Sequence, residues 1–213
     1  MEKLIKKYNI IIAIVVFIGI PLLFYSLGNY PRRSILKESI SILTILALFQ
    51  MLSQFYLARS NKVMLQANKM ASVVKVHKFI GYFFVSILLL HPILIVFPRY
   101  FESGVEPITA LIALLTSFDN TGVLLGMIAY VLMLILGLTS LMRNKLPLSY
   151  KSWRVFHGIL SVLFIGFATL HVIKQGRHSS LPFSLYIAGV AFIGILLLLK
   201  MYFSKLIKRK GDI

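Results

Sequence analysis

Two long apolar segments of this chain each carry a pair of histidines, and the two pairs have the same spacing. The first segment runs from Val76 to Pro92 and holds His77 and His91; the second holds His157 and His171. In each pair the histidines are fourteen residues apart. In an α-helix, fourteen residues rise about 21 Å and return to within roughly 40° of the starting direction. Each helix would therefore present two imidazoles on nearly one face, at two depths of a membrane.

The composition is that of an integral membrane protein. Of the 213 residues, 59% are hydrophobic, whereas soluble domains are usually about 45–50% apolar. The length suits one compact bundle, so we expect a single domain over residues 1–213 without a separate soluble catalytic domain. The chain contains no cysteine, which excludes disulfides, iron–sulfur clusters and thiolate ligands.

Six apolar stretches are long enough to cross the hydrocarbon core of a bilayer, which predicts an all-α, six-helix transmembrane bundle. They cover about residues 9–27, 36–57, 75–97, 121–142, 153–174 and 182–203. A polar, basic connector separates the second span from the third. Within the loop after the third span, the apolar stretch from Pro107 to Leu115 predicts a short helix at the membrane interface.

Three polar or helix-breaking features within the spans carry further predictions. Pro21 should bend the first helix and Pro98 should end the third, because proline cannot donate a backbone hydrogen bond. Gln50 and Gln54 lie one turn apart and should face protein, where they form hydrogen bonds between helices.

The basic residues are distributed unequally between the two sides of the predicted bundle. One side holds 17 of the 23 lysines and arginines; the other keeps Arg32, Arg33, Lys37, Arg99, Lys174 and Arg177. The positive-inside rule then places both termini in the cytoplasm, in a multi-pass protein of the cell membrane. Because anionic lipids and this rule explain the net charge of +17, we expect a lipid partner and no nucleic acid.

With this topology the third and fifth helices run parallel, so His77 lies level with His157 and His91 with His171. An imidazole inside a membrane is costly unless its nitrogens are engaged. Heme iron accepts histidine as an axial ligand, and two histidines fill its coordination sphere, which favours electron transfer over ligand chemistry. We therefore predict two stacked bis-histidine heme sites between these helices, with the four histidines as metal ligands. Helix-packing hydrogen bonds or a proton relay are the alternatives for these residues.

Phe84 and Phe164 lie midway between the ligands of their helices, seven residues from each. They should project into the gap between the two porphyrins, or else fill space beside lipid. Gly81 and Ser161 each follow a ligand by one turn, where a small side chain lets a flat macrocycle approach the helix; small residues serve ordinary helix contacts equally well.

Cations flank the predicted ligands. Lys78 and Arg154 lie beside the inner ligands, and Lys174 and Arg177 beyond an outer one. Any of them could pair with heme propionates, and snorkelling to the lipid headgroups is the alternative for each. His178 lies in an outer loop, and we expect it to be a surface histidine close to the outer acceptor.

At these residues the sequence resembles the ferric-reductase-like transmembrane domain family. The resemblance covers about Lys75 to Ile173, and its specific parts are H-K-F-I-G-Y with L-L-L-H-P, and S-Y-K-S-W-R-V-F-H with T-L-H. The family includes the membrane parts of NADPH oxidases and ferric reductases, and the heme-binding partner of periplasmic methionine sulfoxide reductase. It implies six helices and two b-type hemes, held through histidines that match the four named above.

The resemblance implies a heme-containing oxidoreductase subunit that moves electrons from a cytoplasmic donor to an outer acceptor. Many members continue into flavin and nicotinamide domains, whereas this chain stops at Ile213 and has no Gly-rich dinucleotide fingerprint. The expected donor is therefore a separate flavin reductase, carrying FAD or FMN, or membrane quinol. The acceptor could be ferric iron, a flavoprotein or another redox protein. The alternative function is a transporter that binds a transition metal through its intramembrane histidines.

Overall fold

The computed structural model describes residues 2–57, 69–102 and 104–211, and in this part of the chain every regular element is helical. Six helices are long and apolar enough to cross a membrane, as the sequence predicts. The first span combines α1 (Glu2–Ile14), η1 (Val15–Gly19) and α2 (Ile20–Leu27); the others are α3 (Ile35–Tyr56), α5 (Met70–Val96), α7 (Thr121–Leu141), α8 (Tyr150–Gln175) and α9 (Leu181–Gly211). Most of the polar connector expected after the second span, residues 58–68, lies outside the described residues.

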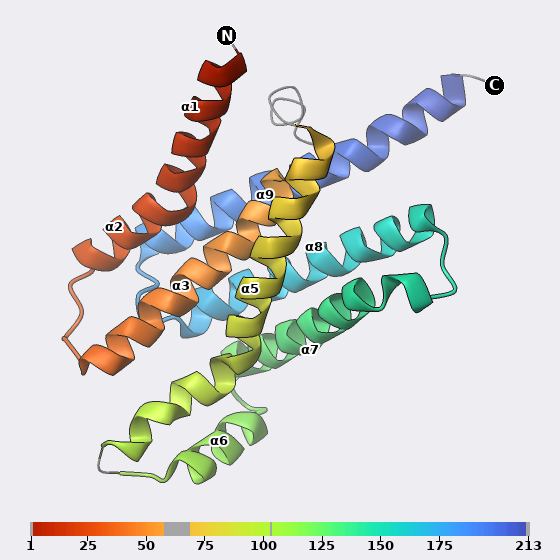
Figure 1. Ribbon diagram of the computed structural model, residues 1–213. Helices are drawn as coiled ribbons and strands as arrows, with labels where there is room; N and C mark the ends of the chain where they lie inside the picture. Colours follow the sequence, from red (N-terminus) through yellow and green to blue (C-terminus); the bar gives the residue numbers. More distant parts are fainter. Residues whose placement is uncertain (1, 58–68, 103, 212–213) are drawn as a thin grey trace.

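The helices form two packed groups (Figure 1). α7 and α8 form an antiparallel hairpin, with η3 (Arg143–Lys145) in the turn between them. α3 packs extensively against α5 and also against α9. Direct contact between α5 and α8 is sparse by comparison with either of these pairings. The N-terminal end of α1 and the C-terminal end of α9 lie at the same end of the bundle, as an even number of spans requires.

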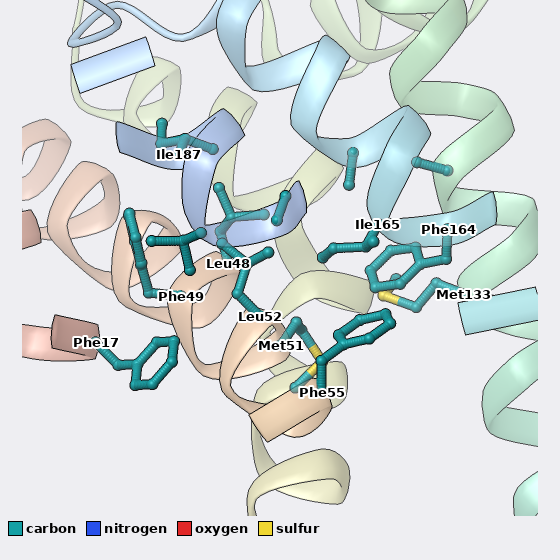
Figure 2. Packing of buried hydrophobic residues seen from close by; sticks show 14 of the residues in the cluster. Phe17, Leu48, Phe49, Met51, Leu52, Phe55, Met133, Phe164, Ile165 and Ile187 are labelled. Carbon is teal, nitrogen blue, oxygen red and sulfur yellow. The ribbon is translucent and has the colours of Figure 1, made fainter. Parts of the chain in front are cut away.

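The centre of the core lies on α3. Its buried apolar residues include Phe49 and Leu52, and they pack against Ile187 of α9 and Ile165 of α8 (Figure 2). Phe17 of η1 joins the same cluster from the first span. Large apolar side chains elsewhere are mostly exposed on the outer faces of the helices, where a bilayer would cover them.

The expected bend at Pro21 takes the form of a π-helical turn over Val15–Gly19. Here the Ile20 N–H donates to the Val15 carbonyl, five residues back. In this register the next donor would be residue 21, and proline has none. The Val16 carbonyl instead accepts from the Tyr186 hydroxyl of α9, at 2.6 Å.

A side chain of α3 bonds the next carbonyl of the first span, that of Phe17. Gln50 donates through Nε2 to the Phe17 carbonyl at 3.4 Å, which is the hydrogen bond between helices that its sequence position predicts. Gln54 donates instead to the Gln50 carbonyl of its own helix, at 3.2 Å. The first span is therefore held to the bundle through two neighbouring carbonyls of its π-helical turn, those of Val16 and Phe17.

At the opposite end, α5 stops at Val96 and a 3-10 turn over Phe97–Tyr100 follows, with Pro98 at its start. The expected short helix is α6 (Pro107–Thr116). Ile108, Ile112 and Leu115 are exposed and recur at helical spacing on one face. This is the pattern of a helix that lies in the membrane interface.

The π-turn generates a test by double mutation. Tyr186→Phe removes the donor to the Val16 carbonyl and should lower the free energy of unfolding by about 0.5–2 kcal/mol, the range for hydrogen bonds between membrane helices. In the Pro21→Ala background the backbone regains an N–H that can donate to this carbonyl. Tyr186→Phe should then lower the free energy of unfolding clearly less than it does with proline at position 21. The measurement is the unfolding, in mixed micelles, of the wild type, the two single variants and the double variant.

Tyr202→Phe is the matched control, because the Tyr202 hydroxyl donates to the Arg154 carbonyl far from this turn, at 2.9 Å. Its cost should be the same with proline or alanine at position 21. Equal costs for Tyr186→Phe in the two backgrounds would contradict the role assigned to Pro21.

Candidate functional site

The structure brings the four intramembrane histidines together as two pairs across α5 and α8. The ring centroids of His77 and His157 are 6.4 Å apart, and those of His91 and His171 are 6.5 Å apart. The two helices therefore run parallel with their histidines at matching levels. We refer to the two ends of the bundle below as the His77 end and the His91 end.

Both separations suit two imidazoles that share one metal ion from opposite sides. Bonds between imidazole nitrogen and a first-row metal are about 2.0–2.1 Å long, so the ring centroids of two opposed ligands lie roughly 6–6.5 Å apart. The ring planes cross at 64° and 83°. Axial ligation allows these angles, because each imidazole can rotate about its own bond to the metal.

A carbonyl of α7 orients His171. Its Nδ1 lies 2.7 Å from the Gly122 carbonyl oxygen, which can only accept, so Nδ1 carries the proton. The lone pair of Nε2 is then available to a metal, which is the arrangement that most histidine ligands adopt.

The helix α7 can approach His171 so closely because it has no side chain at Gly126. A Cβ added at Gly126 would lie 2.5 Å from His171 Nδ1 and 2.6 Å from Cε1. Any larger residue would displace the imidazole. By contrast, a Cβ at Gly189 of α9 would meet nothing within 4 Å.

His157 also has its neighbours on α7 and on its own helix. The Ser140 hydroxyl lies 3.3 Å from His157 Nδ1. The indole ring of Trp153 lies 5.0 Å from the imidazole, centroid to centroid, and its Nε1 donates to the Thr139 carbonyl at 3.3 Å. Both histidines of α8 are thus supported by α7, a span that carries no histidine itself.

The α5 histidines are less constrained. His91 Nδ1 is buried and has no hydrogen-bond partner among the described residues, so this polar group is paired with neither protein backbone nor side chain. Only Val73 and Val96, near the ends of α5, are buried in this helix. The stretch between them, which carries both histidines, faces α8 without packing tightly against it.

The aromatic residues expected between the two levels point inward. Phe164 belongs to the buried core cluster, beside Met133 of α7 (Figure 2), and Phe84 packs against the same cluster. Phe84 also makes an edge contact with Phe83, with ring centroids 4.9 Å apart. A position between two porphyrins remains a prediction for both.

The small and basic residues predicted beside the ligands have different surroundings. A Cβ at Gly81 would meet nothing within 4 Å, whereas the Ser161 hydroxyl donates to the His157 carbonyl at 2.7 Å. Lys78 is exposed. Arg154 is half-buried, and its guanidinium lies 5.7 Å from the centroid of the Tyr150 ring.

A shallow hollow of about 750 Å³ lies at the His91 end beside α7 and α8. Asn120 is central to it, because its Oδ1 accepts from the backbone N–H groups of Gly122 and Val123 and so caps α7. Lys174 and Asp119 contribute opposite charges to the lining. Since Gly122 lines this hollow and also bonds His171, solvent lies one residue away from the imidazole pair.

The expectation that His178 lies on the surface is wrong. Only 8% of the residue is exposed, and its ring lies between those of Tyr25 and Tyr30, with centroids 4.6 and 4.9 Å away. Its Nε2 is 3.7 Å from the Glu38 carboxylate. Glu38 also accepts from Tyr25 at 2.5 Å and from Arg33 at 2.9 Å. His178 therefore packs the turn between α8 and α9 against the loop between α2 and α3.

Comparison with known proteins finds a relative and a family. The model of the family described as ferric reductase like transmembrane component matches residues 43–168, which is more than half of the chain. An uncharacterised protein of Archaeoglobus fulgidus is 39% identical over 160 residues, covering 75% of this chain and 87% of the relative. No solved structure matches the chain.

The buried position of His178 predicts a dependence of stability on pH. Burial lowers the pKa of His178, whereas the same group in the unfolded chain titrates near about 6.5. The contribution of His178 to the free energy of unfolding is therefore fully present above about pH 6.5 and is lost as the pH falls below this value. His178→Phe keeps the ring contacts and cannot be protonated, so the loss of thermal stability between about pH 7.5 and 5.5 should be smaller than in the wild type. Parallel pH profiles for the two proteins would contradict this role, since every other titrating group is shared.

Proposed function

Because this chain belongs to the ferric reductase like transmembrane component family, we propose that it transfers electrons across a membrane through two b-type hemes. The observation that carries the proposal is the pair of imidazole separations, 6.4 and 6.5 Å, at two levels of parallel helices. His77 and His157 would hold one heme, and His91 and His171 the other. Heme supplies an iron that accepts and releases one electron at a time.

The surroundings of the four histidines fit a large flat group between α5 and α8. The two helices contact each other sparsely, although α7 contacts both of them. His171 presents Nε2 to the space between them, because its Nδ1 is bonded to Gly122. A position beside Gly81 is open to a macrocycle, since nothing lies within 4 Å of the missing Cβ. Phe84 and Phe164 lie on the inward side of the helices between the two levels.

The charge distribution supports an orientation. The described acidic side chains, Glu38, Glu102, Glu106 and Asp119, all belong to the His91 end, whereas the His77 end carries a large excess of lysine and arginine. The positive-inside rule then places the His77 end and both termini in the cytoplasm. Electrons would pass from a cytoplasmic flavoprotein or a membrane quinol to the first heme, and leave from the second. Lys78 and Arg154 remain the candidates to pair with propionates of the first heme.

The acceptor would meet the outer heme at the hollow around Asn120, since one of its lining residues, Gly122, bonds the ligand His171. One acidic, one basic and two amide side chains line this hollow, which suits a hydrated or polar acceptor. Ferric iron, a flavoprotein and another redox protein all satisfy this description.

A transition-metal transporter is less well supported. Among the described residues, no group of three or more histidine, aspartate or glutamate side chains could hold a metal ion. Zinc sites use four ligands, or three and a water, and each level of this bundle offers two imidazoles. Two opposed imidazoles complete the coordination of a six-coordinate porphyrin-bound iron.

The first test is the absorption spectrum of the purified protein before and after dithionite, with heme quantified per chain. We expect about two hemes per chain, in reducible low-spin form. His77→Ala or His157→Ala should remove one heme, and His91→Ala or His171→Ala the other. The alternative would be supported by a colourless protein that binds zinc stoichiometrically. Full heme occupancy after all four substitutions would refute the proposal.

A second test uses the contact between α7 and His171. Gly126→Ala places a methyl group on the imidazole and should remove most of the outer heme while leaving the inner one in place. Gly189→Ala is the matched control, because its added methyl group has room, and it should retain both hemes. Heme content and the reduced spectrum distinguish the two variants, and equal outer-heme occupancy in both would show that α7 does not position this ligand.

A further inference from the structure

An aromatic stack extends from the ligand His157 to the surface of the His77 end. The rings of Trp153 and His157 are tilted by 31° at 5.0 Å. Tyr150 stacks on Trp153 with 16° between the planes and 6.2 Å between the centroids. Tyr150 is 48% exposed and Trp153 is half-buried, so the three rings form a graded path from solvent to the imidazole. We call these residues the Trp153 stack.

A guanidinium group covers the outer part of the stack. Arg143, in the turn between α7 and α8, lies 4.4 Å from the centroid of the Tyr150 ring and 5.1 Å from that of Trp153. Cations over aromatic faces are attracted by the ring quadrupole, which fixes this charge at the rings. A lysine or arginine that snorkels to lipid headgroups would extend away from such contacts.

Three cations around the stack, Arg143, Lys145 and Lys151, form no ion pair with a described acidic residue. All ion pairs between described residues lie at the opposite end, among Arg33, Glu38, Lys37, Glu102 and His178. These three cations therefore give the surface around the aromatic path to His157 a positive charge that no described acidic residue offsets.

We propose that the Trp153 stack and Arg143 form the docking surface for an acidic flavoprotein, which delivers electrons through Tyr150 and Trp153 to the heme held by His77 and His157. The inference rests on the proposed heme function and adds the donor class and the route. In each transfer the reduced flavin of the donor loses one electron, the ferric iron gains it, and the flavin proton passes to bulk water. Complementary charge would steer the donor and fix its orientation.

Membrane quinol fits these residues less well. A quinol is uncharged and would approach from the hydrocarbon, so it would not require cations in a loop beyond the span. Anionic lipid would neutralise lysines anywhere on this face and would need no aromatic path. The coincidence of an exposed ring stack, a fixed guanidinium and a ligand histidine favours a protein donor whose charge is negative.

The experiment exploits the single tryptophan of the chain. The protein is produced with fluorotryptophan, so its fluorine NMR spectrum reports Trp153 alone, and is placed in nanodiscs of zwitterionic phosphatidylcholine. Flavodoxin, a small acidic flavoprotein, is the probe. Titration with oxidised flavodoxin should shift or broaden the line, and the apparent Kd should rise steeply as salt increases from about 50 to 300 mM.

Arg143→Gln should weaken binding by roughly three- to tenfold, because it removes the fixed charge over the rings. The control is Arg99→Gln, an exposed cation of the His91 end, which should bind flavodoxin as the wild type does. Stopped-flow reduction of the heme by reduced flavodoxin gives the route. Trp153→Leu should lower the limiting rate several-fold while the flavodoxin concentration that gives half of this rate stays unchanged, and Trp153→Phe should largely restore the limiting rate. Reduction by dithionite confirms equal heme content in all variants.

Docking that is insensitive to salt, or equal in Arg143→Gln and the wild type, would overturn the proposal. Reduction by a quinol analogue that slows in Trp153→Leu, with no response of Trp153 to flavodoxin, would assign the surface to quinol instead. These failures are separate from failure of the heme function, which would appear as wild-type protein without a heme spectrum. The fluorine line would still report docking in that case.

Discussion

The arrangement of this bundle depends on the cost of placing an imidazole in hydrocarbon. Each such ring has two polar nitrogens, and each nitrogen must be engaged or the membrane-embedded state is disfavoured. On α8 the protein engages one of them, through the Gly122 carbonyl for His171 and Ser140 for His157. Each of these rings faces an imidazole of α5, with ring centroids 6.4 and 6.5 Å apart. The two helices are therefore related by their facing histidines more than by packing against each other.

The two ends of the bundle are stabilised differently. At the His91 end, Lys37 of α3 pairs with Glu102 in the loop after α5, and the hydrogen bond from its ammonium group lowers the pKa of that carboxyl group. The cluster of Tyr25, Glu38 and His178 closes the neighbouring loops. The His77 end has cations without such partners in the described residues. One end is thus tied together internally, while the other presents charge to its surroundings.

Much of this fold was predictable because its determinants are periodic. Apolar stretches near twenty residues long predict the six spans. Equal histidine spacing on two helices separated by a single span, which makes them parallel, predicts the pairing of His77 with His157. The role of α7 was not predictable, because Gly122, Gly126 and Ser140 act through backbone oxygen, an absent side chain and a hydroxyl. Such residues occur at any helix contact. His178 was assigned to the surface because a loop position carries no information about what folds over it.

The same limit applies to the first span. Pro21 predicted a bend, but the π-turn and its supporting donors from α3 and α9 depend on which distant side chains reach the Val16 and Phe17 carbonyls. Sequence identifies the missing donor in the chain, while only tertiary structure identifies its replacement. Gly126, which makes room for His171, and Tyr186, which bonds the Val16 carbonyl, are alike in this respect, because each acts on a helix other than its own.

The division of the four histidines between two helical units has a consequence for biogenesis. α7 and α8 form one hairpin that already orients its imidazoles, while α5 belongs with α3 and leaves the His91 Nδ1 unpaired. Each unit can thus complete its own backbone hydrogen bonds during insertion from the ribosome. Under the proposed function, iron porphyrin would enter between the two units from the bilayer and join them by binding histidines of both.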